Sequence, residues 1–427
     1  MKPAKEISNG DKLSPPQSAG WGQLVPTRWR TVKLGEVCVS KAETPNPADA
    51  PDSTFVYVDI TSVDNVSKRI VAPKELIGRN APSRARQIIR TGNVLLSTTR
   101  PNLNAVALVP PELDGQIAST GFCVLRSGEQ IDSEFLFSYV RTPQFVSNLT
   151  ELTKGALYPA VNDKQIFAQI ISLPPLDEQK RIAARLRERM AEVERARAAV
   201  QMQLDAAQSL PAALLREIFA SAVARRWPSA TLGDESQVVG GMQKTPDRAP
   251  REFHKQFLTV RNVQRGYLDL RNVERFEVTP AEFERLRLHR GDLLIVEGNG
   301  SVDHIGRNAL FNEEGEWIHQ NHIIRVRLSQ ARLLPDFVSE YLNSEAGCTQ
   351  MLEKAKTTTG LYTLSTKKIA SLVVPMPSLV EQRRVAARLD TELTAARVLV
   401  ETLETRLAEI ELLPAALLRS AFSRQNE

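Results

Sequence analysis

Two segments of this chain repeat each other without a gap and so divide it into two similar halves. Residues 174–219 begin PPLDEQKRIAARL and end LPAALLREIF, and residues 377–422 begin PSLVEQRRVAARL and end LPAALLRSAF. At an offset of 203, 18 of the 47 positions from Leu173 to Phe219 are identical, and they cluster at the two ends. An ungapped match of this length indicates a duplicated unit. The chain is therefore expected to contain the same arrangement of elements twice.

The stretches before the two repeats also correspond, although more loosely. Residues 28–36 match 226–234, 55–58 match 257–260, 92–96 match 291–295, 134–139 match 336–341, and 155–158 resemble 359–362. The matching positions have the character of a framework, whereas the residues between them differ. This pattern predicts two globular domains with a shared scaffold and different loops.

The elements of each globular domain mix strands and helices. Short β-branched runs such as FVYVDI, NVLLSTT and DLLIVEG predict strands, whereas SEFLFSYVRTPQFVSNL and PDFVSEYLNSEAGCTQMLEKA predict helices. The fold class is therefore α+β. The predicted order is a flexible N-terminal tail (1–25), a first domain (26–172), a helical spacer (173–225), a second domain (226–374) and a second helical spacer (375–427).

The repeated segments are predicted to be long amphipathic helices. Apolar residues recur at near-heptad spacing, and charged residues fill the other faces, which is typical of coiled-coil pairing. The pairing positions are Ile182, Leu186, Val193, Val200, Leu204, Val385, Leu389, Leu399, Leu403 and Ile410. Pro211 and Pro414 lie at the same place in both copies, where each is expected to kink the helix or start a short terminal one.

The order of the elements predicts a pseudo-two-fold dumbbell. The first helix begins directly after one domain and ends just before the other, and the second helix can bury its stripe on the first only by running antiparallel to it. Residues 176–209 alone make about 50 Å of helix at about 1.5 Å per residue. If both domains contacted one DNA duplex, that separation would span roughly 13–15 base pairs at about 3.4 Å per step.

Composition fits a folded protein with a polyanionic partner. Hydrophobic residues make up 42% and charged residues 25% of the chain, and the net charge is +5. A basic excess suits DNA, although this one is modest. Cys38, Cys123 and Cys348 are far apart, which disfavours a disulfide framework or a zinc knuckle and fits a reducing cytoplasm. The polar N-terminus does not have the pattern of a signal peptide.

The repeated helix start resembles that of a known family. LPPLDEQKRIAARL at 173–186, with its second copy PSLVEQRRVAARL, looks like the central helix of the specificity subunits of type I restriction-modification systems. Residues 29–37 and the phrase Thr99-Arg100-Pro101-Asn102-Leu103-Asn104 resemble stretches of that family's target-recognition domains. Pro377-Ser378 departs from the usual double proline. The resemblance covers the chain from about residue 26.

The resemblance implies both a function and partners. It implies a cytoplasmic, non-catalytic subunit that binds double-stranded DNA, with one half of a bipartite asymmetric target for each domain. It also implies two methyltransferase subunits, which use S-adenosylmethionine, and two restriction subunits in a restriction-competent complex, which use ATP and Mg²⁺. This chain itself is expected to bind no cofactor.

Motifs for catalysis are missing from the sequence. An adenine methyltransferase needs an Asp/Asn-Pro-Pro-aromatic motif, and a P-loop needs GxxxxGK[ST]; neither occurs. Gly298-Asn299-Gly300 lacks the third glycine of a dinucleotide fingerprint and predicts a turn. His319 and His322 are expected to be surface or DNA-facing histidines rather than metal ligands.

Candidate DNA contacts lie in loops at equivalent places in the two domains. Arg, Asn and Gln can bond base edges bidentately, and Lys mostly holds phosphate. In the first domain the candidates are Thr98, Thr99, Arg100, Asn102, Asn104, Lys154, Tyr158, Asn162 and Lys164. In the second domain they are Asn299, Ser301, His304, Arg307, Asn308, Lys354, Lys356, Thr357 and Tyr362.

Two alternatives remain open at this point. One is a self-contained nuclease or methyltransferase, which methyl transfer by the purified chain alone would reveal. The other is a pseudo-symmetric coiled-coil scaffold whose domains bind proteins, which would show the same repeat and the same amphipathic helices. Sequence-specific, salt-dependent DNA binding separates DNA recognition from this scaffold, because neutralisation of phosphates gives a steep salt dependence.

Overall fold

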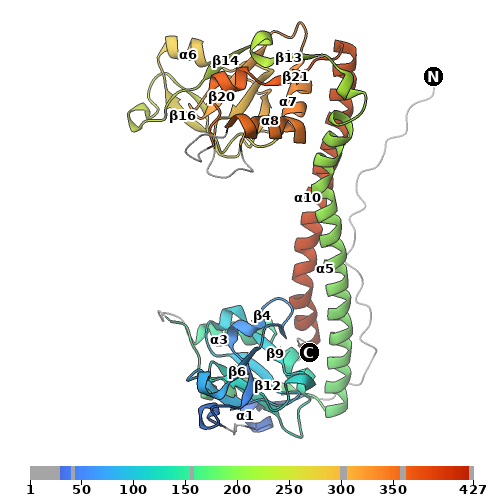
Figure 1. Cartoon of the computed structure of the whole chain (residues 1–427). Helices are drawn as coiled ribbons and strands as arrows, with labels where there is room; N and C mark the ends of the chain where they lie inside the picture. Colours follow the sequence, from blue (N-terminus) through green and yellow to red (C-terminus); the bar gives the residue numbers. More distant parts are fainter. Residues whose placement is uncertain (1–28, 40–43, 154–157, 299–304, 356–361, 423–427) are drawn as a thin grey trace, which may run out of the picture. The chain divides into compact units, whose positions relative to one another are not determined.

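The computed structural model describes residues 29–39, 44–153, 158–298, 305–355 and 362–422. The chain forms two compact units, which are described one at a time (Figure 1). Unit 1 comprises Met1–Arg197 with Glu409–Glu427, and unit 2 comprises Ala198–Ala408. Each unit mixes helices and strands, so the predicted α+β class is confirmed. Both unit boundaries fall inside long helices, and the predicted domain limits stay predictions. The predicted tail, 1–25, lies outside the described residues.

Unit 1 is built on two four-stranded sheets and two smaller pairs of strands. The first sheet has the order β6-β3-β10-β7, the second β2-β11-β8-β9, and the pairs are β1-β12 and β4-β5. The strands are β1 (Arg30–Lys33), β2 (Cys38–Val39), β3 (Thr54–Val58), β4 (Val63–Asp64), β5 (Arg69–Ile70), β6 (Lys74–Ile77), β7 (Ala85–Ile88), β8 (Val94–Ser97), β9 (Val106–Leu108), β10 (Ile117–Ser119), β11 (Phe122–Ser127) and β12 (Ile170–Leu173).

Short helices close the core of unit 1. They are α1 (Leu34–Val37), α2 (Ser133–Tyr139), α3 (Pro143–Glu151) and α4 (Asp163–Phe167), with the 3-10 turns η1 (Pro47–Asp49), η2 (Ile60–Ser62), η3 (Gly78–Asn80), η4 (Pro101–Leu103) and η5 (Pro111–Leu113). Asp132 caps α2 through the N–H of Phe135, and Thr142 caps α3. Strand β8 is buried along its whole length, in keeping with its three apolar residues before Ser97.

Unit 2 repeats this architecture with different details. Its sheets have the orders β14-β20-β17-β18 and β16-β15-β19, with the pair β13-β21. The strands are β13 (Ser229–Thr231), β14 (Ser236–Gly240), β15 (His254–Leu258), β16 (Glu274–Glu277), β17 (Asp292–Val296), β18 (Asn308–Phe311), β19 (Trp317–His319), β20 (Ile323–Leu328) and β21 (Val373–Pro375). The shorter helices are α6 (Pro280–Leu286), α7 (Pro335–Asn343), α8 (Glu345–Ala355) and α9 (Thr366–Ala370), and the 3-10 turns are η6 (Ala224–Arg226), η7 (Leu232–Glu235) and η8 (Pro246–Arg248).

The strand registers give a residue-by-residue match between the units. In unit 1 the parallel pair β3-β10 places Tyr57 opposite Ile117, and in unit 2 the pair β15-β19 places Phe257 opposite Ile318. The hairpin β8-β9 likewise places Leu96 opposite Val106, and β17-β18 places Ile295 opposite Asn308. The framework predicted from the loose sequence matches is thus present in both units, with one correction: the strand register sets Tyr57 beside Phe257, whereas the sequence match had paired it with Thr259.

The two repeats form α5 (Leu176–Phe219) and α10 (Leu379–Phe422), each 44 residues long. Both helices continue through Pro211 and Pro414, so the alternative in which each proline starts a separate helix is wrong. None of the described helices combines the length and the apolar character needed to cross a lipid bilayer.

Each unit contains the start of one long helix beside the end of the other (Figure 1). In unit 1 the core joins Ile182 and Leu186 of α5 to Leu418 and Phe422 of α10. Further along α5, Arg197 forms an ion pair with Glu411 at 4.0 Å, so the two segments run antiparallel. Unit 2 shows the reciprocal arrangement, because Leu215, Ile218 and Phe219 of α5 pack with Val385 and Leu389 of α10.

Most of the predicted pairing positions are buried. These are Ile182, Leu186, Val193, Val200, Leu204, Val385, Leu389 and Leu403. Ile410 is half-buried. Leu399 departs from the prediction, because it is 43% exposed. The buried positions Leu389, Ala396 and Leu403 are seven residues apart, and Leu399 lies outside this narrow seam.

A glutamine explains why the helix start is repeated so closely. The side chain of Gln179 is fully buried, and its Nε2 donates to the carbonyl oxygens of Pro174 and Gln130 at 2.8 and 3.0 Å. Gln382 is equally buried and donates to the carbonyl oxygens of Pro377 and Arg332, both at 2.8 Å. Each glutamine thereby ties the first turn of a long helix to the loop that precedes α2 or α7.

Candidate nucleic-acid interface

Unit 1 brings together the two loop segments that the sequence singled out. The N–H of Arg100 donates to the carbonyl oxygen of Pro159 at 2.8 Å, and the N–H of Val161 donates to the carbonyl oxygen of Thr98 at 2.8 Å. The loop that follows β8 is therefore joined to the segment around residues 158–161, although 60 residues separate them in the chain. The side chains of Arg100, Asn102 and Tyr158 are exposed on this junction.

Unit 2 makes the same connection at the matching place. Gly298, just after β17, forms an antiparallel bridge with Thr363, and the N–H of Leu364 donates to the carbonyl oxygen of Glu297 at 2.6 Å. The segment that contains Tyr362 therefore lies beside the end of the β17 strand. Six predicted contacts fall outside the described residues: Lys154, Asn299, Ser301, His304, Lys356 and Thr357.

A third segment, which the sequence analysis missed, joins each junction. It is the hairpin that follows β3 in unit 1 (59–70) and β15 in unit 2 (259–269). In unit 1, Nζ of Lys68 donates to the carbonyl oxygen of Asn104 at 2.5 Å. In unit 2, the N–H of Gly266 donates to the carbonyl oxygen of Asn308 at 2.8 Å. The run Arg261-Asn262-Val263-Gln264-Arg265 is rich in base-reading residue types, and this signal could have revealed the hairpin.

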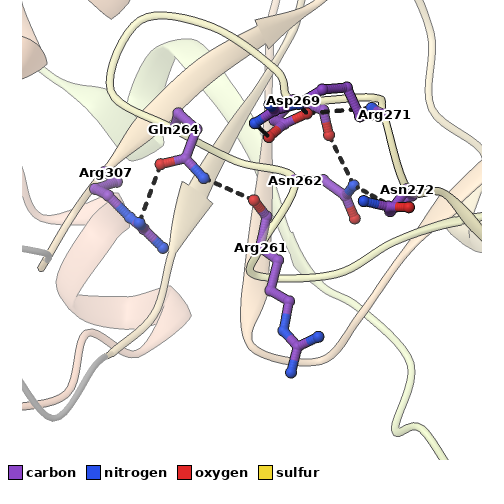
Figure 2. Close-up of polar contacts among 7 residues, drawn as sticks. All are labelled: Arg261, Asn262, Gln264, Asp269, Arg271, Asn272 and Arg307. Atoms are coloured by element: carbon purple, nitrogen blue, oxygen red, sulfur yellow. Dashed lines mark hydrogen bonds and ion pairs between the residues drawn. The ribbon is translucent and has the colours of Figure 1, made fainter. Parts of the chain in front are cut away.

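The hairpin of unit 2 is held by its own polar contacts (Figure 2). Asn262 is buried and donates to the carbonyl oxygens of Asp269 and Asn272 at 2.8 and 2.9 Å. Nη1 of Arg307 donates to Oε1 of Gln264 at 3.2 Å. The side chain of Arg261 is exposed and points away from the other labelled side chains. A rigid loop with a projecting guanidinium suits the reading of base edges.

The structure gives several predicted DNA contacts a structural role instead. Asn308 is fully buried. Its side-chain amide donates a hydrogen bond to Oδ1 of Asn343 and accepts one from the hydroxyl of Ser339, so we exclude this side chain from the interface. Asn162 caps α4 by accepting from the N–H of Gln165 at 3.0 Å. The hydroxyl of Thr98 donates to the carbonyl oxygen of Gly121 at 2.9 Å.

The remaining predicted residues are accessible to different degrees. Lys164 is exposed on α4, whereas Thr99, Asn104, Arg307, Lys354 and Tyr362 are half-buried. Arg307 donates through Nη2 to the carbonyl oxygen of Val260 at 3.2 Å, and burial lowers the pKa of its guanidinium. Because Arg307 already donates to Gln264 and Val260, its main role is to support the hairpin rather than to contact DNA.

The sequence predicted that His319 and His322 both lie at the surface or face DNA, but the structure places them in different environments. His319 is fully buried, and its Nδ1 lies 3.0 Å from the carbonyl oxygen of Ile323. Burial lowers the pKa of His319 to about 4, so the imidazole is neutral. The expectation that His319 faces solvent or DNA is therefore wrong. His322 is exposed and lies 3.1 Å from a carboxylate oxygen of Glu297.

Half-buried cations gather near the junction of unit 1. Burial, with the charge of Arg141 acting in the same direction, lowers the pKa of Lys68 to about 8. Burial also lowers the pKa of Arg141 to about 10, and its guanidinium carbon lies 4.7 Å from the centre of the Phe137 ring. The charge of Asp64 raises the pKa of Lys68 and that of Glu194 raises the pKa of Arg141, but burial outweighs both effects. Burial of a positive charge is costly unless a negative group compensates it.

The chain as a whole is similar to several known proteins. Residues 26–199 match the family model described as the type I restriction modification DNA specificity domain. A chain from a structure of a type I restriction-modification system, solved to study complex assembly and conformational transition, is 30% identical. The match covers 94% of this chain and 100% of that one, with a TM-score of 0.79.

Two further relatives agree with this match. The HsdS subunit from Thermoanaerobacter tengcongensis is 30% identical, with 95% and 99% of the two chains covered and a TM-score of 0.64. The EcoKI specificity subunit of Escherichia coli K12 is 26% identical over 317 residues, which are 70% of this chain and 67% of that protein. On this evidence the chain belongs to the family of type I restriction-modification specificity subunits.

Proposed function

We propose that this chain reads a bipartite, asymmetric DNA target, with one half-site for each unit. One observation carries the proposal. Both units join the loop after the same strand, the same late segment and the same hairpin, but they place different polar side chains there. Unit 1 presents Arg100 and Asn102, and unit 2 presents Arg261. A shared framework with different readers suits two different half-sites.

The spacer between the half-sites is proposed to follow from the long helices. Helices α5 and α10 have 44 residues each, which corresponds to about 65 Å at about 1.5 Å per residue. The two helices have the same length and their ends pack in a reciprocal way, which supports the proposal that together they set the distance between the half-sites. A change of length in both helices together is therefore expected to change the number of unread base pairs.

The subunit itself is proposed to be non-catalytic and to work in the cytoplasm, where its DNA is. Its partners are two methyltransferase subunits and, in a restriction-competent complex, two restriction subunits. S-adenosylmethionine, ATP and Mg²⁺ belong to those partners in this proposal. The family model for a DNA specificity domain and the likeness to the HsdS subunit support these assignments.

The test is a methylome. The chain is co-expressed with its cognate methyltransferase subunit in a host without adenine methylation, and modified adenines are mapped by single-molecule sequencing. The proposal predicts one bipartite asymmetric motif with a fixed spacer, which is lost when this chain is omitted. Methylation without a sequence motif, or no methylation by a soluble and associated complex, would instead favour the protein-binding scaffold.

A further inference from the structure

Three residues of unit 1 hold a backbone conformation that L-amino acids avoid. Lys68, Arg100 and Asn104 have φ angles of +57°, +49° and +47°. All three belong to the junction of the hairpin with the loop after β8. A left-handed conformation costs a non-glycine residue free energy, least for asparagine, and such strain collects at ligand-binding sites.

The internal repeat shows what an unstrained choice would be. In unit 1, Lys68 comes two residues before Ile70, which pairs with Val63; in unit 2, Gly266 comes two residues before Leu268, which pairs with Val263. Gly266 has a φ of +82°, so both units use the same left-handed position, and only unit 2 fills it with glycine. Unit 1 therefore retains a lysine where its backbone favours glycine.

Asn104 follows the same pattern. Because Leu96 pairs with Val106 and Ile295 with Asn308, Asn104 corresponds to Gly306, which has a φ of +66°. Lys68 and Asn104 are also joined by the hydrogen bond from Nζ to the backbone oxygen. Unit 1 thus replaces two glycines at one junction with a cation and an amide.

The contacts that Lys68 makes within the protein do not explain why a lysine, rather than a glycine, occupies this position. The carboxylate that acts on Lys68, Asp64, already accepts the N–H of Ser67 at 2.7 Å, and Glu194 is the carboxylate that acts on Arg141. Arg141 adds a second positive charge, and its Nε is buried without a hydrogen-bond partner. Among the described residues, neither cation forms a salt bridge with the carboxylate that acts on it. The pair is arranged as it would be for a bound anion.

We propose that Lys68, supported by Arg141, binds a backbone phosphodiester of the half-site read by unit 1, and that unit 2 lacks this contact. The inference rests on the proposed function. A phosphate would supply the missing negative charge, and Lys68 keeps two N–H donors beyond the one that it gives to Asn104. Such a contact fixes the unit on the duplex and affects all sequences alike.

The experiment measures DNA binding by the complex of this chain with its methyltransferase subunit. The probe is a duplex with the target from the methylome, and affinity is measured over a range of salt concentrations. Lys68→Gly removes the cation and suits the left-handed backbone, so it is expected to fold. It should weaken binding roughly tenfold, as expected for the loss of a charge-assisted hydrogen bond. The slope of log K against log salt should become shallower by about 0.9. Lys68→Arg should keep the slope.

Gln330→Gly is the matched control. Gln330 has a φ of +60° and lies near Gly291, at the end of β17 opposite to the junction. The variant relieves similar strain but removes no charge, and it should leave both affinity and salt slope unchanged. Thermal unfolding of both variants checks that the fold is kept.

Replacement of single phosphates by neutral methylphosphonates identifies the ligand. In the half-site of unit 1, one replacement should weaken the natural complex about tenfold and have no effect on Lys68→Gly. Two results would refute the phosphate contact while the natural complex still binds its target specifically, so that the proposed function stands. Either Lys68→Gly keeps the salt slope of the natural complex, or Lys68→Gly is weakened by the same methylphosphonate replacements as the natural complex. A natural complex that binds all duplexes equally refutes both.

Discussion

The side-chain oxygen of Gln179 accepts a hydrogen bond from the backbone N–H of Asp132 at 2.9 Å. Asp132 in turn caps α2 by accepting the N–H of Phe135. In unit 2, Gln382 accepts from the N–H of Leu334 at 2.8 Å, directly before α7. One buried glutamine in each copy therefore joins a long helix to the helix that covers the core of the preceding domain.

Replacement of Gln179 by alanine should destabilise unit 1 by about 2–4 kcal/mol, because it leaves one N–H and two carbonyl groups without their partner in a buried place. Gln382→Ala should have an effect of the same size in unit 2. Chemical denaturation measures both. Lys180→Ala, at the exposed next position, is the control and should stay within about 0.5 kcal/mol of the natural protein. Equal stabilities for Gln179→Ala and Lys180→Ala would contradict this role.

The neutral, buried His319 should make unit 2 sensitive to acid. Its pKa is about 4 in the folded chain and about 6.5 when exposed, so the unfolded state binds more protons between these values. The contribution is complete above about pH 6.5 and is lost as pH falls towards 4, by up to about 3 kcal/mol.

His319→Gln tests this by comparison, because the variant can keep a donor to Ile323 but cannot take up a proton. The free energy of unfolding should fall less steeply between pH 6.5 and 4 in the variant than in the natural protein. Parallel curves in that window would show that His319 does not govern the acid response. His322→Gln, which changes an exposed imidazole, is the matched control.

Arg100→Ala and Arg261→Ala should each relax a different half-site. Both side chains are exposed at equivalent junctions, and loss of a bidentate contact to a base costs about 1–3 kcal/mol of discrimination. The methylome of each variant should tolerate substitutions at one position of one half-site. Lys164→Ala serves as a comparison, because a lysine that contacts phosphate would weaken all sites without a change of motif. Relaxation of both half-sites by one arginine would contradict the assignment.

A change in helix length should change the spacer alone. Deletion of seven residues between Arg187 and Gln208, with the matching seven from α10, removes about 10 Å of each helix and preserves the heptad seam. The motif should keep both half-sites and lose about three spacer base pairs at about 3.4 Å per step. An unchanged spacer in an active, folded variant would refute the helices as the length standard.

The repeat allowed much of the fold to be predicted, because patterns of sequence report local structure well. The helix starts, the seam and the equivalence of the loops after Ser97 and Val296 all follow from spacing. The buried role of Asn308 did not, because its partner Asn343 lies 35 residues away, and only tertiary structure brings them together.

The hairpin of unit 1 and the burial of His319 were missed for related reasons. Strands β4 and β5 have two residues each, and a lysine occupies a turn position that glycine usually marks. His319 occupies a core position of β19 where unit 1 has Ala118, so its polar character concealed its burial. Residues that depart from the local rule were thus the least predictable part of the chain.

The central claim is that each unit reads one half-site, and the methylome of a domain exchange tests it most directly. Residues 226–374 are replaced by the corresponding domain of another family member with a known target, and the hybrid is expressed with the same methyltransferase subunit. The account predicts a motif in which one half-site is replaced and the other half-site and the spacer are kept. A hybrid that methylates a motif changed in both half-sites, or in neither, would contradict it.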